Sequence, residues 1–74
     1  MNEHILKELL FGHLDGLVRL AKNYPNHARE YFNQAYGAVS FISCIISDTE
    51  VTYIWASKYS IMFDTIMYGE EEKN

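Results

Sequence analysis

Three histidines offer the most direct route to metal chemistry in this chain of 74 residues. His4 and Glu8 are four positions apart, so they would share one face of a helix and supply two ligands. His13 lies more than two helical turns beyond His4, which is too far to join that pair. A usual zinc site needs three or four convergent ligands. The sequence therefore predicts no bound metal and no other cofactor, with the histidines at the surface or at the edge of the core.

Cys44 is the only thiol, and it lies in the most apolar run of the chain, residues 36–47. Such surroundings disfavour the thiolate, so we expect a buried and unreactive cysteine rather than a nucleophile. Asp15, Asp48 and Asp64 are isolated from one another in sequence, and no glycine-rich phosphate-binding loop is present. Because the sequence offers no catalytic constellation, it predicts that the protein is not an enzyme.

The charge pattern argues against nucleic acid and anionic membranes as partners. The formal net charge is −4, and three of the ten acidic residues lie at positions 70–72, so the rest of the chain is nearly balanced. A balanced surface attracts neither a phosphate backbone nor an anionic lipid headgroup. No apolar stretch reaches the roughly 20 residues that a membrane span needs, and no secretory signal pattern is visible. A single cysteine excludes an internal disulfide, and these features together predict a cytoplasmic protein.

Aromatic residues are the one strong departure from ordinary composition. Six tyrosines, four phenylalanines and one tryptophan exceed what the core of so short a chain can hold. Tyrosine and tryptophan suit interfaces because each joins an apolar body to a polar tip. We therefore predict an interface near the C-terminus, with Trp55 as its anchor, formed by Tyr53, Trp55, Tyr59 and Phe63. The alternative is that these rings lie half-buried at the rim of the core.

The element around which the other residues must pack is an apolar helix predicted over residues 25–46. Its inward positions recur at steps of three and four, namely Ala28, Phe32, Ala35, Val39, Ile42 and Ile46. We expect Ile42 to be among the most buried residues of the chain. So broad an apolar face requires neighbours on two sides, and the flanking segments must supply them.

The first neighbour is a helix predicted over residues 3–22, with Asn2 as its cap. Gly12 and Gly16 are unusual inside it, since each costs about 1 kcal/mol relative to alanine. Two glycines four positions apart indicate either close approach of another backbone or a break near residues 15–16. The leucine spacing continues through both glycines and favours one continuous helix. Pro25 then predicts a short turn and an antiparallel neighbour.

The second neighbour is predicted over residues 49–68. Ser47 and Glu50 have the spacing of a capping box, with Ser47 as the cap. The segment also reads as a strand, because many β-branched and aromatic residues fall on odd positions. Helix is favoured because the run is too long for an ordinary strand and because no other segment reads as a strand to pair with it.

The sequence therefore predicts an all-α protein, a small three-helix up-down-up bundle that dimerisation would complete. Residues 1–69 would form a single domain, and residues 70–74 a disordered acidic tail. The predicted function is a non-enzymatic protein–protein interaction module or small regulator, which binds a second copy or another protein through an aromatic and aliphatic helix face. The alternative is a small helix-turn-helix-like nucleic-acid-binding protein, but only Arg29 and Lys58 are basic between positions 23 and 72.

Overall fold

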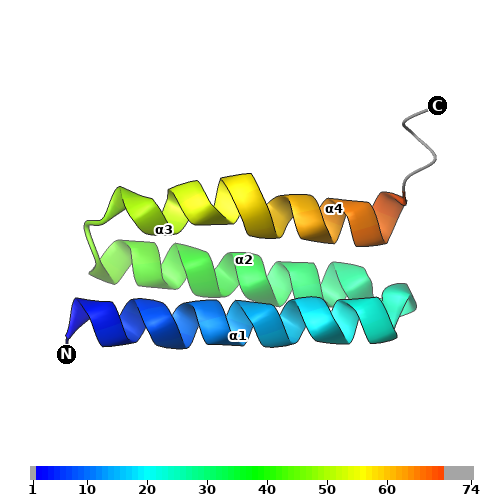
Figure 1. Ribbon diagram of the computed structural model, residues 1–74, viewed down its shortest axis with the longest axis horizontal. Coiled ribbons are helices and arrows are strands. Elements are labelled where there is room, and N and C mark those ends of the chain that lie inside the picture. The colour runs from blue at the N-terminus through cyan, green and yellow to red at the C-terminus, as the bar shows by residue number, and fades with distance from the viewer. Residues whose placement is uncertain (1, 70–74) are drawn as a thin grey trace.

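Three helical rods in up-down-up order make up the computed structural model, which describes residues 2–69 (Figure 1). The elements are α1 (Glu3–Asn23), η1 (Pro25–His27), α2 (Ala28–Ile45), α3 (Thr49–Ile54), η2 (Trp55–Tyr59) and α4 (Ser60–Tyr68). The last three are continuous and form the third rod, which runs parallel to α1 and antiparallel to α2 (Figure 1). Since no strand occurs within residues 2–69, the all-α three-helix prediction is confirmed, and the strand alternative for residues 51–68 is excluded. The predicted tail, residues 70–74, lies outside the described residues.

α1 begins as the sequence predicts, with Asn2 as its cap. The Asn2 side-chain oxygen accepts a hydrogen bond from the backbone N–H of His4 at 2.8 Å, which satisfies one of the free donors of the first turn. The helix then continues without a break through Gly12 and Gly16. The prediction of one continuous helix is therefore confirmed, and the alternative of two short helices is wrong.

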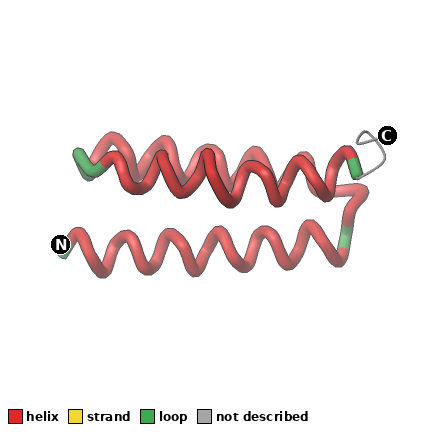
Figure 2. The backbone as a smooth tube through the Cα atoms, turned by 45° about the horizontal axis from the view of Figure 1, so that its top comes forward, coloured by secondary structure: helices red, strands yellow, loops and turns green. Residues whose placement is uncertain are grey.

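The two connections lie at opposite ends of the rods, as Figure 2 shows. Pro25 opens the first connection and disfavours helical geometry at Tyr24, so α1 ends before it. In the second connection, the side chain of Asp48 accepts a hydrogen bond from the backbone N–H of Glu50 at 2.9 Å. The prediction of Ser47 as cap is wrong, because the backbone is still extended at Asp48 (φ −112°, ψ 115°) and the helix begins one residue later.

The core lies where the three rods meet. Its buried side chains are Leu10, Leu14, Leu17, Val18, Ala21, Ala28, Ala35, Val39, Ile42, Ile46, Val51, Tyr59 and Phe63. The predicted stripe of α2 faces this core except at Phe32, which is half-buried between α2 and the third rod. Ile42 faces the core but is not among its most buried residues, because it is 9 % exposed, whereas Ile46, in the turn after α2, is 1 % exposed.

The third rod departs from regular helix at η2, a five-residue π-helical turn. There the backbone N–H of Ser60 donates to the carbonyl of Trp55, five residues earlier. An α-helix has 3.6 residues per turn, so each step of four residues overshoots a full turn by about 40°. From Val51 to Phe63 the overshoot would reach about 120°, and the wider turn takes up part of it. Val51, Tyr59 and Phe63 therefore all face the core.

Candidate interaction surface

The four residues of the predicted interface do not share a surface. Tyr59 and Phe63 lie inside the core, with exposed fractions of 2 % and 0 %, and Trp55 is half-buried. Tyr53 alone is well exposed, at 71 %. The structure therefore places three of the four rings against the chain itself, two of them deeper than the rim-of-core alternative expects and only Trp55 at the rim.

An aromatic seam joins α2 to the third rod. We use this name for Phe32, Tyr36, Trp55 and Phe63. The ring centroid of Phe32 lies 5.7 Å from that of Trp55 and 5.8 Å from that of Phe63, and the centroids of Tyr36 and Trp55 are 6.2 Å apart. Each such pair contributes about 0.5–1.5 kcal/mol beyond the burial of its area. Much of the unusual aromatic content is thus used to hold two rods of one chain together.

Tyr59 ties the third rod to α1. Its hydroxyl donates a hydrogen bond to Asp15 Oδ1 at 2.7 Å, and its ring stacks on Phe11 at a centroid distance of 6.2 Å. Burial, followed by the hydrogen bond to Asp15 and the charge of that carboxylate, raises the pKa of Tyr59 to about 12. A phenol that stays protonated while it donates to a carboxylate is a structural link, and it leaves Asp15 engaged rather than free for acid–base chemistry.

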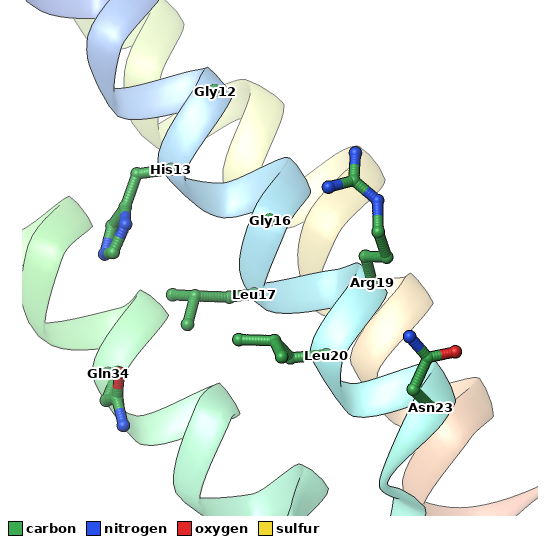
Figure 3. Close-up of a pocket in the computed structure, with 8 residues that line it drawn as sticks. All are labelled: Gly12, His13, Gly16, Leu17, Arg19, Leu20, Asn23 and Gln34. Atoms are coloured by element: carbon green, nitrogen blue, oxygen red, sulfur yellow. The ribbon is translucent and has the colours of Figure 1, made fainter.

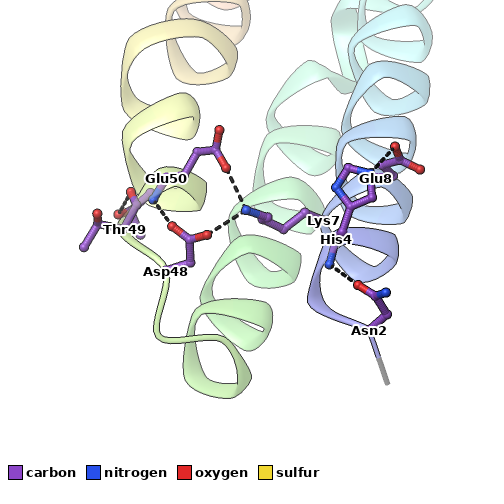
Figure 4. Close-up of polar contacts among 8 residues, drawn as sticks. Asn2, His4, Lys7, Glu8, Asp48, Thr49 and Glu50 are labelled. Atoms are coloured by element: carbon purple, nitrogen blue, oxygen red, sulfur yellow. Dashed lines mark hydrogen bonds and ion pairs between the residues drawn. The ribbon is translucent and has the colours of Figure 1, made fainter.

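Lys7 ties α1 to the turn before α3, as Figure 4 shows. Its Nζ lies 2.6 Å from Asp48 Oδ2 and 2.7 Å from Glu50 Oε1. These hydrogen bonds, the one to Asp48 first, hold the pKa of Lys7 above its ordinary value. The hydrogen bond from Lys7, with that from the backbone of Glu50, holds the pKa of Asp48 below its ordinary value. Asp48 therefore caps α3 with one oxygen and binds Lys7 with the other.

Two of the three histidines lie at exposed positions next to a glutamate close by in sequence. His4 Nε2 lies 2.9 Å from Glu8 Oε2, and His27 Nδ1 lies 3.5 Å from Glu30 Oε1. Each pair supplies only two candidate ligands. Among the residues that the structure describes, no group of three or more histidine, cysteine, aspartate or glutamate side chains is arranged to hold a metal ion.

Cys44 is exposed, so the prediction of a buried thiol is wrong. Ile42 faces the core, and two further residues rotate a helix by about 200°. Cys44 therefore points away from the core although its sequence neighbours are apolar. Within residues 2–69, Cys44 belongs to no group of three or more potential metal ligands.

A small hollow lies beside the turn between α2 and α3. Its volume is about 240 Å³, and hydroxyl-bearing side chains dominate its lining, which consists of Ser43, Ile46, Ser47, Asp48, Thr49 and Thr52. Ser43 Oγ is buried there without a hydrogen-bond partner in the described part of the chain. One ordered water can form a hydrogen bond with a serine hydroxyl in this position. Since Asp48 is already engaged by Lys7, the hollow presents no free charged group for catalysis.

A larger open groove of about 550 Å³ crosses the outer side of α1. Its lining residues are Gly12, His13, Gly16, Leu17, Arg19, Leu20, Asn23 and Gln34 (Figure 3). A Cβ atom added at Gly12 or Gly16 would meet nothing within 4 Å. The close approach that we expected at these glycines is therefore absent within the described chain. Both glycines leave a notch in the surface of α1, beside α2.

Apolar side chains continue from this groove toward the other end of α1 and α2. Gln34 lies beside Leu17 and Leu20 in the groove, which sets the register of the two antiparallel helices. Phe41 is seven positions, about two turns, beyond Gln34 on the same side of α2, and this brings it level with residues 10–13 of α1, roughly one turn or less from Leu9. Leu9 and Phe41 are 61 % and 66 % exposed.

We call this region the α1–α2 face. It comprises five exposed apolar side chains of these helices and the two glycines of α1, namely Ile5, Leu9, Gly12, Gly16, Leu20, Phe41 and Ile45. The sequence prediction missed it because it weighed aromatic residues above aliphatic ones. The sequence feature that could have indicated this face is the pair of glycines in α1, because each lowers the stability of the helix and nothing else in the sequence explains them.

Comparisons with protein-family models, with curated proteins and with solved structures each found no match. Across residues 2–69, none of the helices combines the length and the apolar character that crossing a membrane requires.

Proposed function

We propose that the protein is a non-enzymatic interaction module that binds another polypeptide through the α1–α2 face. The observation that carries this proposal is the exposure of aliphatic and aromatic side chains on two adjacent helices, next to an open groove. Contiguous exposed apolar surface is uncommon on a monomer and generally marks a contact site. The sequence also predicted binding through a helix face of aliphatic and aromatic residues, but it placed that face on the third rod instead of on α1 and α2.

The energetics of the α1–α2 face fit a specific contact. Ile5, Leu9, Phe41 and Ile45 are each half exposed or more. Burial of these four side chains by a partner would contribute on the order of 5 kcal/mol. Association costs roughly 4–15 kcal/mol, so the groove and the polar groups at its edge must supply the remainder. An interface of this kind is centred on a few apolar anchors, with Leu9 and Phe41 as the most exposed of them.

The nucleic-acid alternative has little support from the basic residues of α2 and the third rod. Arg29 Nη2 donates a hydrogen bond to the hydroxyl of Tyr68 at 2.6 Å. Lys58 Nζ lies 5.1 Å from the ring centroid of Tyr59. Both cations are thus engaged within the chain, on different parts of the bundle, whereas groove binding needs several cations along one face.

The proposal is tested by a polar double substitution in the α1–α2 face, Leu9→Gln with Phe41→Gln. Both side chains are exposed, so the variant should fold with a free energy of unfolding close to that of the wild type. The matched control is Tyr53→Gln with Ile61→Gln, which removes two equally exposed apolar side chains from the third rod.

Binding is measured in two formats, by light scattering of the purified chain and by capture of proteins from an extract of its native cells. We expect the wild type and the control variant to bind the same partner, either a second copy or another protein. The Leu9→Gln/Phe41→Gln variant should no longer bind it. Equal binding of the partner by both variants would contradict the proposal. So would a loss of binding confined to the Tyr53→Gln/Ile61→Gln variant. The absence of any partner in both formats would also contradict it.

A further inference from the structure

We infer that the occupant of the α1–α2 face is a second copy of the chain, with α1 packed antiparallel against α1 of the partner. This inference rests on the proposed function and names its partner. A two-fold axis would pass between the helices at the level of residue 14, midway between Gly12 and Gly16. Such an axis is the commonest symmetry of a dimer, because one self-complementary surface serves both copies.

The charges along α1 single out this arrangement. Glu8 and Arg19 are eleven positions apart, about three turns, so they lie on the same edge of the outer side of α1. With a rise of 1.5 Å per residue, Glu8 lies about 9 Å to one side of residue 14 and Arg19 about 7.5 Å to the other. In an antiparallel pair, Glu8 therefore faces the partner's Arg19 with an axial offset of about 1.5 Å. Symmetry repeats the ion pair at the other end.

The apolar edge of α1 has the same spacing. Leu9 and Leu20 are also eleven positions apart, and Leu20 lies on the side of α1 that faces Gln34 of α2 (Figure 3). The two-fold axis places the partner's Leu20 beside Leu9, on the side of α1 that faces α2 and roughly one turn from the level of Phe41. Each copy would therefore cover the exposed apolar pair of the other. Arg19 points to the opposite side of α1, away from Gln34, so the charged and apolar edges stay separate (Figure 3).

The alternative orientation fails on charge. In a parallel two-fold pair the symmetry axis runs along the helices and exchanges their edges, so the charged edge with Glu8 and Arg19 would lie against the partner's apolar edge and leave both charges without an opposite charge. In the antiparallel pair, the charged edges of the two helices face each other with opposite charges in contact, and the apolar edges also face each other. Gly12 then faces the partner's Gly16 where the helices are closest, and the open space above both glycines admits the second backbone.

Charge reversal tests the inference on the full chain. Glu8→Arg and Arg19→Glu each create two like-charge contacts in the dimer, so each should raise the dissociation constant about tenfold or more. The combination of both substitutions in one chain restores opposite charges and should restore the dimer. An equimolar mixture of the two single variants should form a heterodimer, because every contact in it is again complementary. Sedimentation velocity measures all four samples, and circular dichroism checks that each is folded.

The control is Asp64→Arg, which changes the net charge as Glu8→Arg does but lies at an exposed position of α4, in the third rod. It should leave the dissociation constant unchanged within about twofold. A wild type that stays monomeric at every concentration would overturn the inference, as would single variants that dimerise like the wild type or a mixture that forms no heterodimer. If the wild type is monomeric but captures a different protein that the Leu9→Gln/Phe41→Gln variant loses, self-association is rejected and the proposed function remains supported.

Discussion

The two sides of α2 differ in how their apolar residues are used. Toward the third rod, Phe32, Tyr36 and Trp55 form a seam in which rings contact rings across two elements. Toward α1, the inner leucines are buried, but Leu9 and Phe41 at the outer edge remain exposed. The comparison teaches that residue type alone does not separate core from contact surface. The rings of the seam close the fold, whereas the ring of Phe41 is as exposed as the aliphatic side chain of Leu9.

The aromatic seam should carry the largest share of stability. Phe63 is completely buried and contacts both Phe32 and Trp55, so Phe63→Ala should cost about 3–5 kcal/mol, enough to threaten so short a domain. Ile61, two positions earlier and 55 % exposed, provides the control, because Ile61→Ala should cost less than about 0.5 kcal/mol. Urea titration followed by circular dichroism measures both. Similar losses for the two variants would erase the distinction between the seam and the outer surface.

The contact between the third rod and α1 should weaken in alkali. Because the pKa of Tyr59 is raised from 10.0 to about 12, the folded state keeps a proton that the unfolded state loses between these pH values. The free energy of unfolding should therefore fall as pH rises through this window, by at most about 1.4 kcal/mol per pH unit from this group. Lys7, whose pKa is also raised, acts in the same direction.

Tyr59→Phe isolates the contribution of the hydroxyl. Near neutral pH the variant should lose about 0.5–1.5 kcal/mol, since the freed Asp15 is exposed and can be hydrated. Its stability should fall less steeply than that of the wild type between about pH 10 and pH 12, with the remaining slope due to Lys7. Denaturant titrations at several pH values measure the two slopes. Parallel pH profiles would show that the Tyr59 hydroxyl does not titrate in this window.

Substitutions on the outer side of α1 should change the free energy of unfolding least, and they should raise it. Gly12→Ala and Gly16→Ala should each raise the free energy of unfolding of the monomer by about 0.4–1 kcal/mol, because the added Cβ meets nothing within 4 Å. Thermal melts of dilute protein measure the gain. A loss of stability would mean that the chain itself packs against these glycines, and the α1–α2 face would then not be open.

Most of the fold could be predicted from the sequence. The three- and four-residue spacing from Ala28 to Ile46 identified the inward side of α2, and Pro25 marked the first turn, because both signals are local. The cap at Asp48 was missed by one residue, since Ser47 and Asp48 are both good caps and the choice depends on the Lys7 contact from a distant helix.

The candidate surface was harder to predict than the fold. The π-helical turn at η2 rotates Tyr59 and Phe63 into the core. A prediction based on the 3.6-residue period of a regular helix cannot include such a turn. Whether the glycines of α1 face inward or outward depends on which side the other rods occupy. The predicted interface therefore contained core residues, and the exposed Leu9 and Phe41 were recognised only once the three rods were placed together.

The most direct test of the α1–α2 face as the contact surface is a dilution series followed by amide nuclear magnetic resonance on the wild type. No substitution is needed, because each backbone amide reports on its own surroundings. We expect the signals of Leu9, Gly12, Gly16 and Phe41 to shift with concentration, while those of Tyr53 and Ile61 on the third rod stay constant. Shifts centred on Tyr53 and Ile61, or spectra that are identical at all concentrations, would contradict the assignment of this face as the surface where two copies meet.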